Sequence, residues 1–148
     1  MTPIQVSVQK LHPDAVLPTY GSAEAAGADL YACLASAVSI APGETVMIPT
    51  GLAMAIPQGL GGFVYARSGL ASKRGLAPAN KVGVIDSDYR GEILVALHNH
   101  SGTAVPVQPG ERIAQIVFAP VYAAQFAETD VLPETGRGAG GFGSTGNK

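Results

Sequence analysis

Three stretches of the sequence combine charged or polar side chains with the turn residues that could bring them to a ligand. In the first, ARSGLAS at residues 66–72, an Arg, a hydroxyl and a Gly lie at the start of a short helical pattern. Free backbone N–H groups at a helix N-terminus favour phosphate, and the guanidinium of Arg67 could fork onto its oxygens. A surface helix capped by Ser68 explains the same residues, so this stretch alone leaves phosphate binding and a structural role open.

The second stretch, NKVGVIDSDYRGE at residues 80–92, predicts a hairpin whose tip carries two carboxylates and an aromatic ring. Asp86 directly follows Ile85, so we expect its carboxylate where the strand leaves the core, partly shielded from water. A carboxylate in that position could act as a general base. Polar turn chemistry is the alternative, because Asp and Ser routinely hydrogen-bond to turn backbone.

The third stretch, AAGADLYA at residues 25–32, places Asp29 among small and apolar residues. A charge there is costly unless it is paired or hydrogen-bonded, and a turn Asp bonded to nearby backbone explains it as well as a functional role does. Further along, GERIAQIVF at residues 110–118 sets Arg112 and Gln115 among apolar neighbours. That pattern is typical of a strand and decides nothing alone.

Two other patterns resemble known sites but lack the context those sites need. GAGGFG at residues 138–143 has the spacing of a dinucleotide-binding loop. No strand leads into it, no helix follows, and too few residues remain for an acid about 20 positions further on. His98 and His100 would share one face of a strand, but no third ligand is suitably spaced, so we expect no zinc site and leave their role open.

Composition limits the classes of protein to which the chain could belong. Its 148 residues are 47% hydrophobic, which is enough for one domain with a real core. Only 14% are charged and the formal net charge is −2, so we expect neither nucleic acid nor a membrane as a partner, and any anion site must be local. A single cysteine allows no internal disulfide, and no signal or membrane-spanning segment is evident. We therefore predict a soluble, cytoplasmic protein.

The elements that must position these side chains are predicted to be strands. Nineteen glycines and eleven prolines separate short segments rich in Val and Ile, which is typical of many strands joined by turns. The strand or hairpin segments are 4–11, 35–56, 61–66, 81–99 and 110–121. One short helix is expected in SGLASKRG, with Ser68 as its cap and Gly75 ending it. The fold class is all-β, a jelly-roll-like β-sandwich or barrel.

The C-terminal stretch ETGRGAGGFGSTGNK has almost no apolar side chains to offset the entropy that its glycines lose on ordering. Alone, it should be disordered. We therefore divide the chain into a β domain at residues 1–133 and a flexible glycine-rich arm at residues 134–148.

In this order, AGADL, RSGLAS, NKVGVIDSDYRGE, GERIAQIVF and RGAGGFGSTG resemble the five motifs of the trimeric dUTP diphosphatases (dUTPases), and they extend over residues 26–146. Five motifs in order are highly specific, whereas one could match by chance. Ala66 stands where many relatives have Pro, and Ala28 where many have an aromatic or another residue. Neither departure removes a functional group.

The resemblance implies hydrolysis of dUTP to dUMP and pyrophosphate by Mg²⁺-assisted attack of water on the α-phosphate. This activity would keep uracil out of DNA and supply dUMP for thymidylate synthesis. It also implies a homotrimer whose three active sites are each assembled from all three chains. One subunit contributes the hairpin, a second the phosphate-binding motifs and a third the C-terminal arm, which orders over the bound nucleotide.

The family's functional residues map onto matching positions of this sequence. As catalytic residues, Asp86 would orient and deprotonate the attacking water, and Gln115 would lie close to the α-phosphate. Tyr89 would pack beneath the deoxyribose and exclude a ribose 2′-hydroxyl. Uracil would be read by Asn80, Val84, Ile85, Asp86 and, less firmly, Leu94. The phosphates would be bound by Arg67, Ser68, Gly69, Arg137, Gly143, Ser144 and Thr145, and Phe142 would cover the uracil ring.

The resemblance implies Mg²⁺ as the cofactor, held mainly by the triphosphate and by water and without direct protein ligands. Asp29 would act without contacting the ion, and Arg112 is either structural or close to phosphate. Two alternatives remain beside the diphosphatase. One is a dCTP deaminase, which has the same trimeric fold; the other is a non-catalytic trimer that binds nucleotides or protein partners as a regulator.

Overall fold

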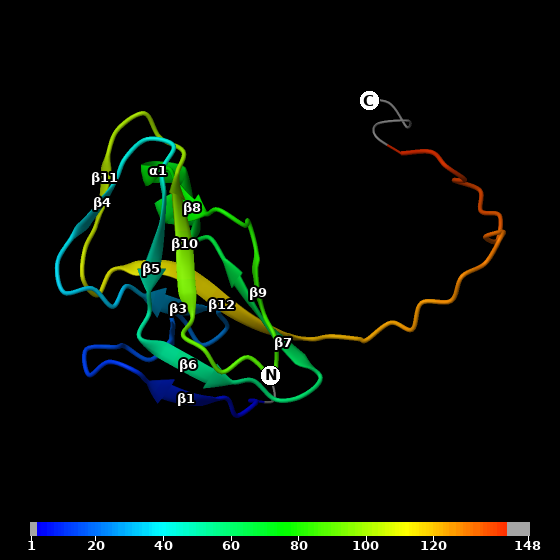
Figure 1. Cartoon of the computed structure of the whole chain (residues 1–148), viewed down its shortest axis with the longest axis horizontal. Helices are drawn as coiled ribbons and strands as arrows, with labels where there is room; N and C mark the ends of the chain where they lie inside the picture. Colours follow the sequence, from blue (N-terminus) through cyan, green and yellow to red (C-terminus); the bar gives the residue numbers. More distant parts are fainter. Residues whose placement is uncertain (1–2, 142–148) are drawn as a thin grey trace.

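The computed structural model describes residues 3–141, which form a β body followed by an extended C-terminal segment (Figure 1). In the described part of the chain there are twelve strands and one short helix. The elements are β1 (Ser7–Lys10), β2 (Thr19–Tyr20), β3 (Ala28–Tyr31), β4 (Val38–Ile40), β5 (Thr45–Pro49), β6 (Leu52–Ala55), β7 (Leu60–Tyr65), α1 (Ser68–Arg74), β8 (Leu76–Pro78), β9 (Gly83–Ile85), β10 (Leu94–Asn99), β11 (Val105–Val107) and β12 (Arg112–Pro120).

The strands form four antiparallel sheets whose neighbours are often distant in sequence. The largest has the order β2-β3-β12-β7-β9, the next has the order β5-β10-β8, and β1 pairs with β6 and β4 with β11. This arrangement confirms the predicted all-β architecture with one short helix. It also brings the C-terminal strand β12 into the middle of the largest sheet, between β3 and β7.

The core lies between the sheets and is filled by the branched apolar side chains that the sequence pattern places inward. In β10, Val95 and Leu97 are buried while Ala96 and His98 are partly exposed, which is the alternation of a strand with one face covered. Ile116 of β12 is fully buried as well. The alternation of apolar and polar residues along a strand therefore indicates which of its faces packs inward.

Helix α1 occupies the predicted place, but its N-terminal cap differs from our expectation. Arg67, in extended conformation, is the N-cap residue and makes no side-chain cap hydrogen bond, whereas Ser68 is the first helical residue. The prediction that Ser68 caps the helix was wrong, because the helix begins one residue earlier than that cap would require. Gly75 ends it as predicted, in the left-handed conformation with φ +70°, and its N–H donates to the carbonyl of Ala71.

Asn99 is a fully buried polar residue that joins three segments of the body. Its Nδ2 donates to the carbonyl oxygens of Ile40 at 2.9 Å and Thr103 at 2.8 Å. Its Oδ1 accepts from the backbone N–H of Ser101 at 2.8 Å and from the Ser101 hydroxyl at 2.7 Å. A buried amide with this many partners stabilises the fold, most through the bond to the Ile40 carbonyl, which is itself buried.

Replacing Asn99 with Leu should destabilise the protein. The variant leaves buried carbonyl and N–H groups without partners, so we expect the free energy of unfolding to fall by about 1–3 kcal/mol or more. Urea denaturation measures the change. Ser101→Ala removes one hydroxyl from the same network and should cost less; an equal loss in both variants would contradict the role given to the Asn99 amide.

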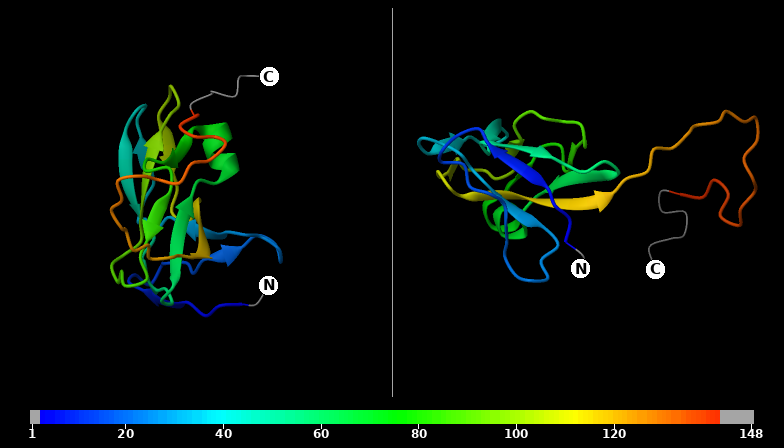
Figure 2. Two further views of the ribbon diagram at one scale, coloured as in Figure 1. Left: turned by 90° about the vertical axis from the view of Figure 1, so that its right-hand side faces the viewer. Right: turned by 90° about the horizontal axis from the view of Figure 1, so that it is seen from below.

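The chain leaves the body at the end of β12 and continues as an extended segment without strand structure (Figure 2). Large apolar side chains on this segment face solvent, with Tyr122 94% and Phe126 95% exposed and Val131 and Leu132 also exposed. The division between body and arm at residue 133 stays a prediction, and residues 142–148 lie outside the described chain. Among the described residues, no helix is long and apolar enough to cross a membrane.

Candidate functional site

The segment 80–92 was predicted to form a hairpin, but the strands on either side of its turn do not pair, because β9 pairs with β7 whereas β10 pairs with β5 and β8 in another sheet. We keep the name hairpin for this turn between the two sheets, which gathers five of the expected site residues around one cavity. Strand β9 pairs with β7, and the chain turns immediately after Ile85. The cavity has a volume of 250 Å³. It is lined by Met47, Val84, Ile85, Asp86, Tyr89, Glu92, Ile93 and Leu94. Three of these were not predicted as site residues, namely Met47, Glu92 and Ile93. Met47 comes from β5, a distant part of the sequence, where the only signal was strand alternation.

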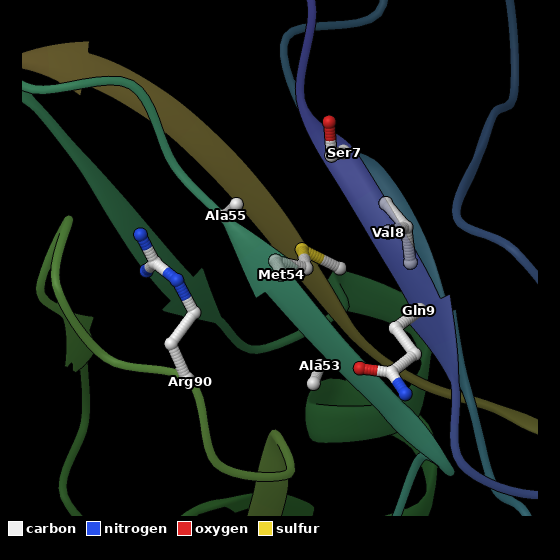
Figure 3. Close-up of a pocket in the computed structure, with 7 residues that line it drawn as sticks. All are labelled: Ser7, Val8, Gln9, Ala53, Met54, Ala55 and Arg90. Atoms are coloured by element: carbon white, nitrogen blue, oxygen red, sulfur yellow. The ribbon is translucent and has the colours of Figure 1, made fainter.

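Backbone hydrogen bonds fix the tip of this hairpin. The N–H of Tyr89 donates to the carbonyl of Asp86 at 3.2 Å, which closes the turn. Nη1 of Arg90 donates to the carbonyl oxygens of Ser87 at 2.7 Å and Tyr89 at 2.9 Å. Figure 3 shows the Arg90 side chain near Met54 of β6, in a cavity of 260 Å³ that none of the predicted site residues line. Arg90 does not line the cavity of Tyr89, but it lines a larger cavity of 720 Å³ together with Asp86.

The orientation of the Tyr89 ring depends on Gly91. The Tyr89 hydroxyl donates to the carbonyl of Glu92 at 2.9 Å, which brings the ring back over the chain. A Cβ at Gly91 would lie only 2.4 Å from the Tyr89 hydroxyl oxygen. The same end of the hairpin is tied to the β5–β6 turn, because Glu92 Oε1 accepts from the N–H of Gly51 at 2.7 Å. The aromatic surface is thus positioned before any ligand arrives.

Asp86 follows β9 as predicted, but the expectation that it is partly shielded from water was wrong for the single chain. Its side chain is exposed, and it also lines a second cavity of 720 Å³ beside Val121, where β12 ends. Asp86 is exposed because it lies just after the end of β9, at the tip of the hairpin. The described part of this chain leaves the outer side of that tip open to solvent.

A second group of predicted residues meets where β3, β12 and β7 lie side by side. Asp29 is 8% exposed and accepts from Nε of Arg67 at 2.7 Å and from Nη1 of Arg112 at 3.2 Å. This pairing explains why a carboxylate is tolerated in an apolar stretch. It also places Arg112, whose role the sequence left open, beside Arg67.

These residues border a cavity of 340 Å³ with a local excess of positive charge. Its lining residues are Arg67, Gly69, Leu70, Lys73, Arg74, Glu111 and Arg112. Arg74 forms an ion pair with Glu111, while Lys73 has no ion-pair partner among the described residues. The sequence places this residue within the expected helix SGLASKRG and does not assign it to a site. A chain of net charge −2 thus has a cationic cavity, as an anion site requires.

The single chain does not bring the two groups together. The cavity of Asp86 and Tyr89 and the cavity of Arg67 and Arg112 have no lining residue in common. Three other predicted residues are exposed and line neither cavity, namely Ser68, Asn80 and Arg137. Four lie outside the described residues, namely Phe142, Gly143, Ser144 and Thr145.

Other reactive side chains give no sign of a further catalytic centre. Burial, followed by the charges of Asp14 and Glu92, raises the pKa of the Cys33 thiol, so it is not an activated nucleophile at neutral pH. The rings of His98 and His100 lie 4.4 Å apart, and desolvation together with His98 lowers the pKa of His100. Within residues 3–141, no three His, Cys, Asp or Glu side chains gather into a metal-binding group.

Removing the Asp29 carboxylate should weaken the fold, because it leaves the guanidinium groups of Arg67 and Arg112 close together without a counter-charge. We expect Asp29→Ala to lower the free energy of unfolding by about 1–3 kcal/mol, near the lower limit because the Arg112 side chain is 50% exposed. Urea denaturation provides the measurement. Asp14→Ala removes an 82% exposed carboxylate 3.7 Å from His12 and should change stability by less than about 0.5 kcal/mol. Equal effects would contradict the bridging role.

Comparison with known proteins identifies the family to which the chain belongs. The chain matches the dUTPase family model over residues 14–146. It is 56% identical over 149 residues to the deoxyuridine 5′-triphosphate nucleotidohydrolase of Desulfitobacterium hafniense and 48% identical over 146 residues to that of Syntrophotalea carbinolica, with 99% of each chain covered in both cases. A mutant dUTPase of Staphylococcus bacteriophage 80alpha, solved with dUpNHpp, matches with a TM-score of 0.88 at 26% identity over 96% of this chain and 98% of that one. The chain therefore belongs to the dUTPase family, with the jelly-roll-like fold predicted from its sequence.

Proposed function

We propose that this protein hydrolyses dUTP to dUMP and pyrophosphate by attack of water on the α-phosphate. The observation that carries the proposal is that a chain of the dUTPase family has two cavities of complementary chemistry. One presents a carboxylate and an aromatic ring, and the other presents a cluster of cations. The relatives' names state hydrolysis of deoxyuridine 5′-triphosphate, and family membership does not favour a dCTP deaminase.

The hairpin cavity takes the deoxyuridine part of the substrate. Tyr89 presents its ring to the deoxyribose, and its hydroxyl is engaged by the Glu92 carbonyl, so the ring cannot retreat to admit a 2′-hydroxyl. The backbone of Val84 to Asp86, together with Asn80, offers the donor and acceptor pattern that distinguishes uracil from cytosine. Leu94 forms part of the apolar wall of the same cavity.

The cationic cavity takes the triphosphate. Arg67 engages Asp29 through Nε, while its Nη groups make no hydrogen bond within the described part of the chain and remain available as donors. Gly69 has nothing within 4 Å of a Cβ position, so its backbone is open to approach. Arg112 and Lys73 add positive charge on the same cavity. Phosphate oxygens prefer such a fork of fixed N–H donors.

Hydrolysis also needs a base to accept a proton from water and cations to neutralise the charge that develops on the leaving pyrophosphate. Asp86 accepts a proton from the attacking water, and Gln115 lies near the α-phosphate. Arg67 and Arg112 stabilise the charge that accumulates on the leaving pyrophosphate. Mg²⁺ would be held mainly by oxygens of the triphosphate and by water. Bound in that way, the ion would supply further charge neutralisation.

The complete site forms in a homotrimer. Because the two cavities of one chain are separate, the hairpin of one subunit meets the phosphate residues of a second, and this contact shields Asp86. The exposed apolar side chains of residues 121–133 pack against a neighbouring subunit, and residues 134–148 close over the substrate. We place this trimer in the cytoplasm.

Asp86→Asn tests the assignment of the base. Without a carboxylate to accept the proton, we expect pyrophosphate release from dUTP with Mg²⁺ to fall by about 10²–10⁴-fold while substrate binding is largely kept. UTP, dCTP and dTTP, assayed beside dUTP, should be poor substrates for the unmodified protein. Asp14→Asn changes an exposed carboxylate outside both cavities and is the matched control. Full activity of Asp86→Asn, or equal turnover of UTP, would contradict the proposal.

Truncated chains test separately whether the trimer assembles and whether the C-terminal arm is needed for turnover. A chain ending at Gly136 lacks Arg137 and the final glycine-rich motif, so we expect it to remain trimeric in light scattering but to lose about a hundredfold or more in turnover, as expected when phosphate donors are removed. A chain ending at Gly146 keeps every motif residue and should be unaffected. Undiminished turnover without the arm, or an active monomer, would overturn the shared-site assembly.

A further inference from the structure

The Gln115 side chain lies at the junction of three strands. Gln115 is opposite Asp29 of β3 and Tyr65 of β7 in the strand register. Its Nε2 donates to the carbonyl of Ala66 at 2.9 Å, directly before Arg67. A carboxamide in this position is next to the cationic cavity but is anchored on backbone and not on a charged side chain.

Gly27 limits the space on the opposite side of this carboxamide. A Cβ at Gly27 would lie 2.5 Å from Oε1 of Gln115, 3.1 Å from its Cδ and 3.2 Å from its Cβ. The first distance is far inside van der Waals contact, so Gln115 would have to move. The φ of Gly27 is not in the left-handed region, so its backbone conformation does not demand glycine. Space for Gln115 is the remaining reason for glycine here.

The anchor also fixes which way the carboxamide faces. A backbone carbonyl can only accept a hydrogen bond, so the nitrogen of Gln115 must face Ala66 and the oxygen must face Gly27. One N–H of Nε2 is used by the carbonyl of Ala66, and the second N–H has no partner among the described residues, so it remains available as a donor. A donor in that place can hold a phosphate oxygen or the oxygen of water, but it cannot take a proton.

We propose that Gly27 is a positioning residue for Gln115: the missing side chain keeps the carboxamide on the Ala66 carbonyl, and Gln115 serves the reaction solely as a hydrogen-bond donor. This inference rests on the proposed function. It separates the two catalytic residues by role, since Asp86 accepts the proton and Gln115 orients the group that reacts.

The test compares Gly27→Ala with Gly21→Ala in the full chain. Gly21 has nothing within 4 Å of a Cβ position, so it controls for the loss of glycine alone. For Gly27→Ala we expect kcat for dUTP to fall by about tenfold to a hundredfold, with KM changed much less and the thermal midpoint unchanged. Unchanged kcat, or a loss of kcat that merely follows a loss of stability, would overturn the proposal.

A double-mutant cycle shows whether Gly27 acts through Gln115. In a Gln115→Ala background Oε1 and Cδ are absent and only the Cβ contact at 3.2 Å remains. Gly27→Ala should therefore cause little further loss of kcat, whereas additive losses would contradict the inference. Gln115→Glu keeps the shape but removes both N–H donors, and it should be at least as impaired as Gln115→Ala. Near-normal turnover of Gln115→Glu would disprove the donor role.

A measurement that does not depend on turnover distinguishes failure of this inference from failure of the proposed function. The side-chain amide signals of Gln115, assigned by their loss in Gln115→Glu, should shift in the nitrogen–proton spectrum of Gly27→Ala and not in that of Gly21→Ala. If the unmodified protein released no pyrophosphate from dUTP, the proposed function would fail and this shift would still test the positioning. Unshifted signals would reject the positioning even in an active enzyme.

Discussion

Antiparallel pairing of β12 between β3 and β7 is the constraint on which the candidate site depends. It sets Gln115 opposite Asp29 on one side and Tyr65 on the other, two residues before Arg67. Gln115, Asp29 and Arg67 thereby lie on or just after three neighbouring strands although they are distant in the sequence. A slip of one residue in this register would turn Gln115 to the opposite face of the sheet, and the buried position of Ile116 opposes such a slip.

The sheet that contains β12 also connects the two cavities, through strand β7. Strand β7 pairs with β12 on one edge and with β9 on the other, so the strand that leads to Arg67 also supports the hairpin that ends at Asp86. The hairpin is further tied to the β5–β6 turn through Glu92. In the proposed trimer, each subunit therefore offers two rigid half-sites, and the precision of the complete site depends on how closely neighbouring bodies pack.

The sequence predicts the helix position, most of the strands and the residues around the hairpin cavity, because alternation, turn residues and motif order are local signals. It misses β2, β3, β8 and β11, which are too short to show a clear alternation, and it does not predict that β9 and β10 lie in different sheets. Ser68 was misplaced as a cap because the extended Arg67 begins the helix, a difference of one residue that propensity does not resolve. The exposure of Asp86 depends on what covers the tip, which a single chain does not contain. The contact of Arg112 with Asp29 spans 83 residues and the space that Gly27 leaves for Gln115 depends on register, so neither has a local signature.

The carboxylate of Asp29 acts as a resident anion between two guanidinium groups. It keeps them at a spacing suited to an anion while the cavity holds no ligand, so little reorganisation is needed when phosphate arrives. It also cancels part of their charge, and a weakly charged ion such as chloride gains little by entering. A ligand with several negative charges still gains much. In the proposed function, this partial cancellation of charge sets a threshold that favours a nucleoside triphosphate over anions of single charge.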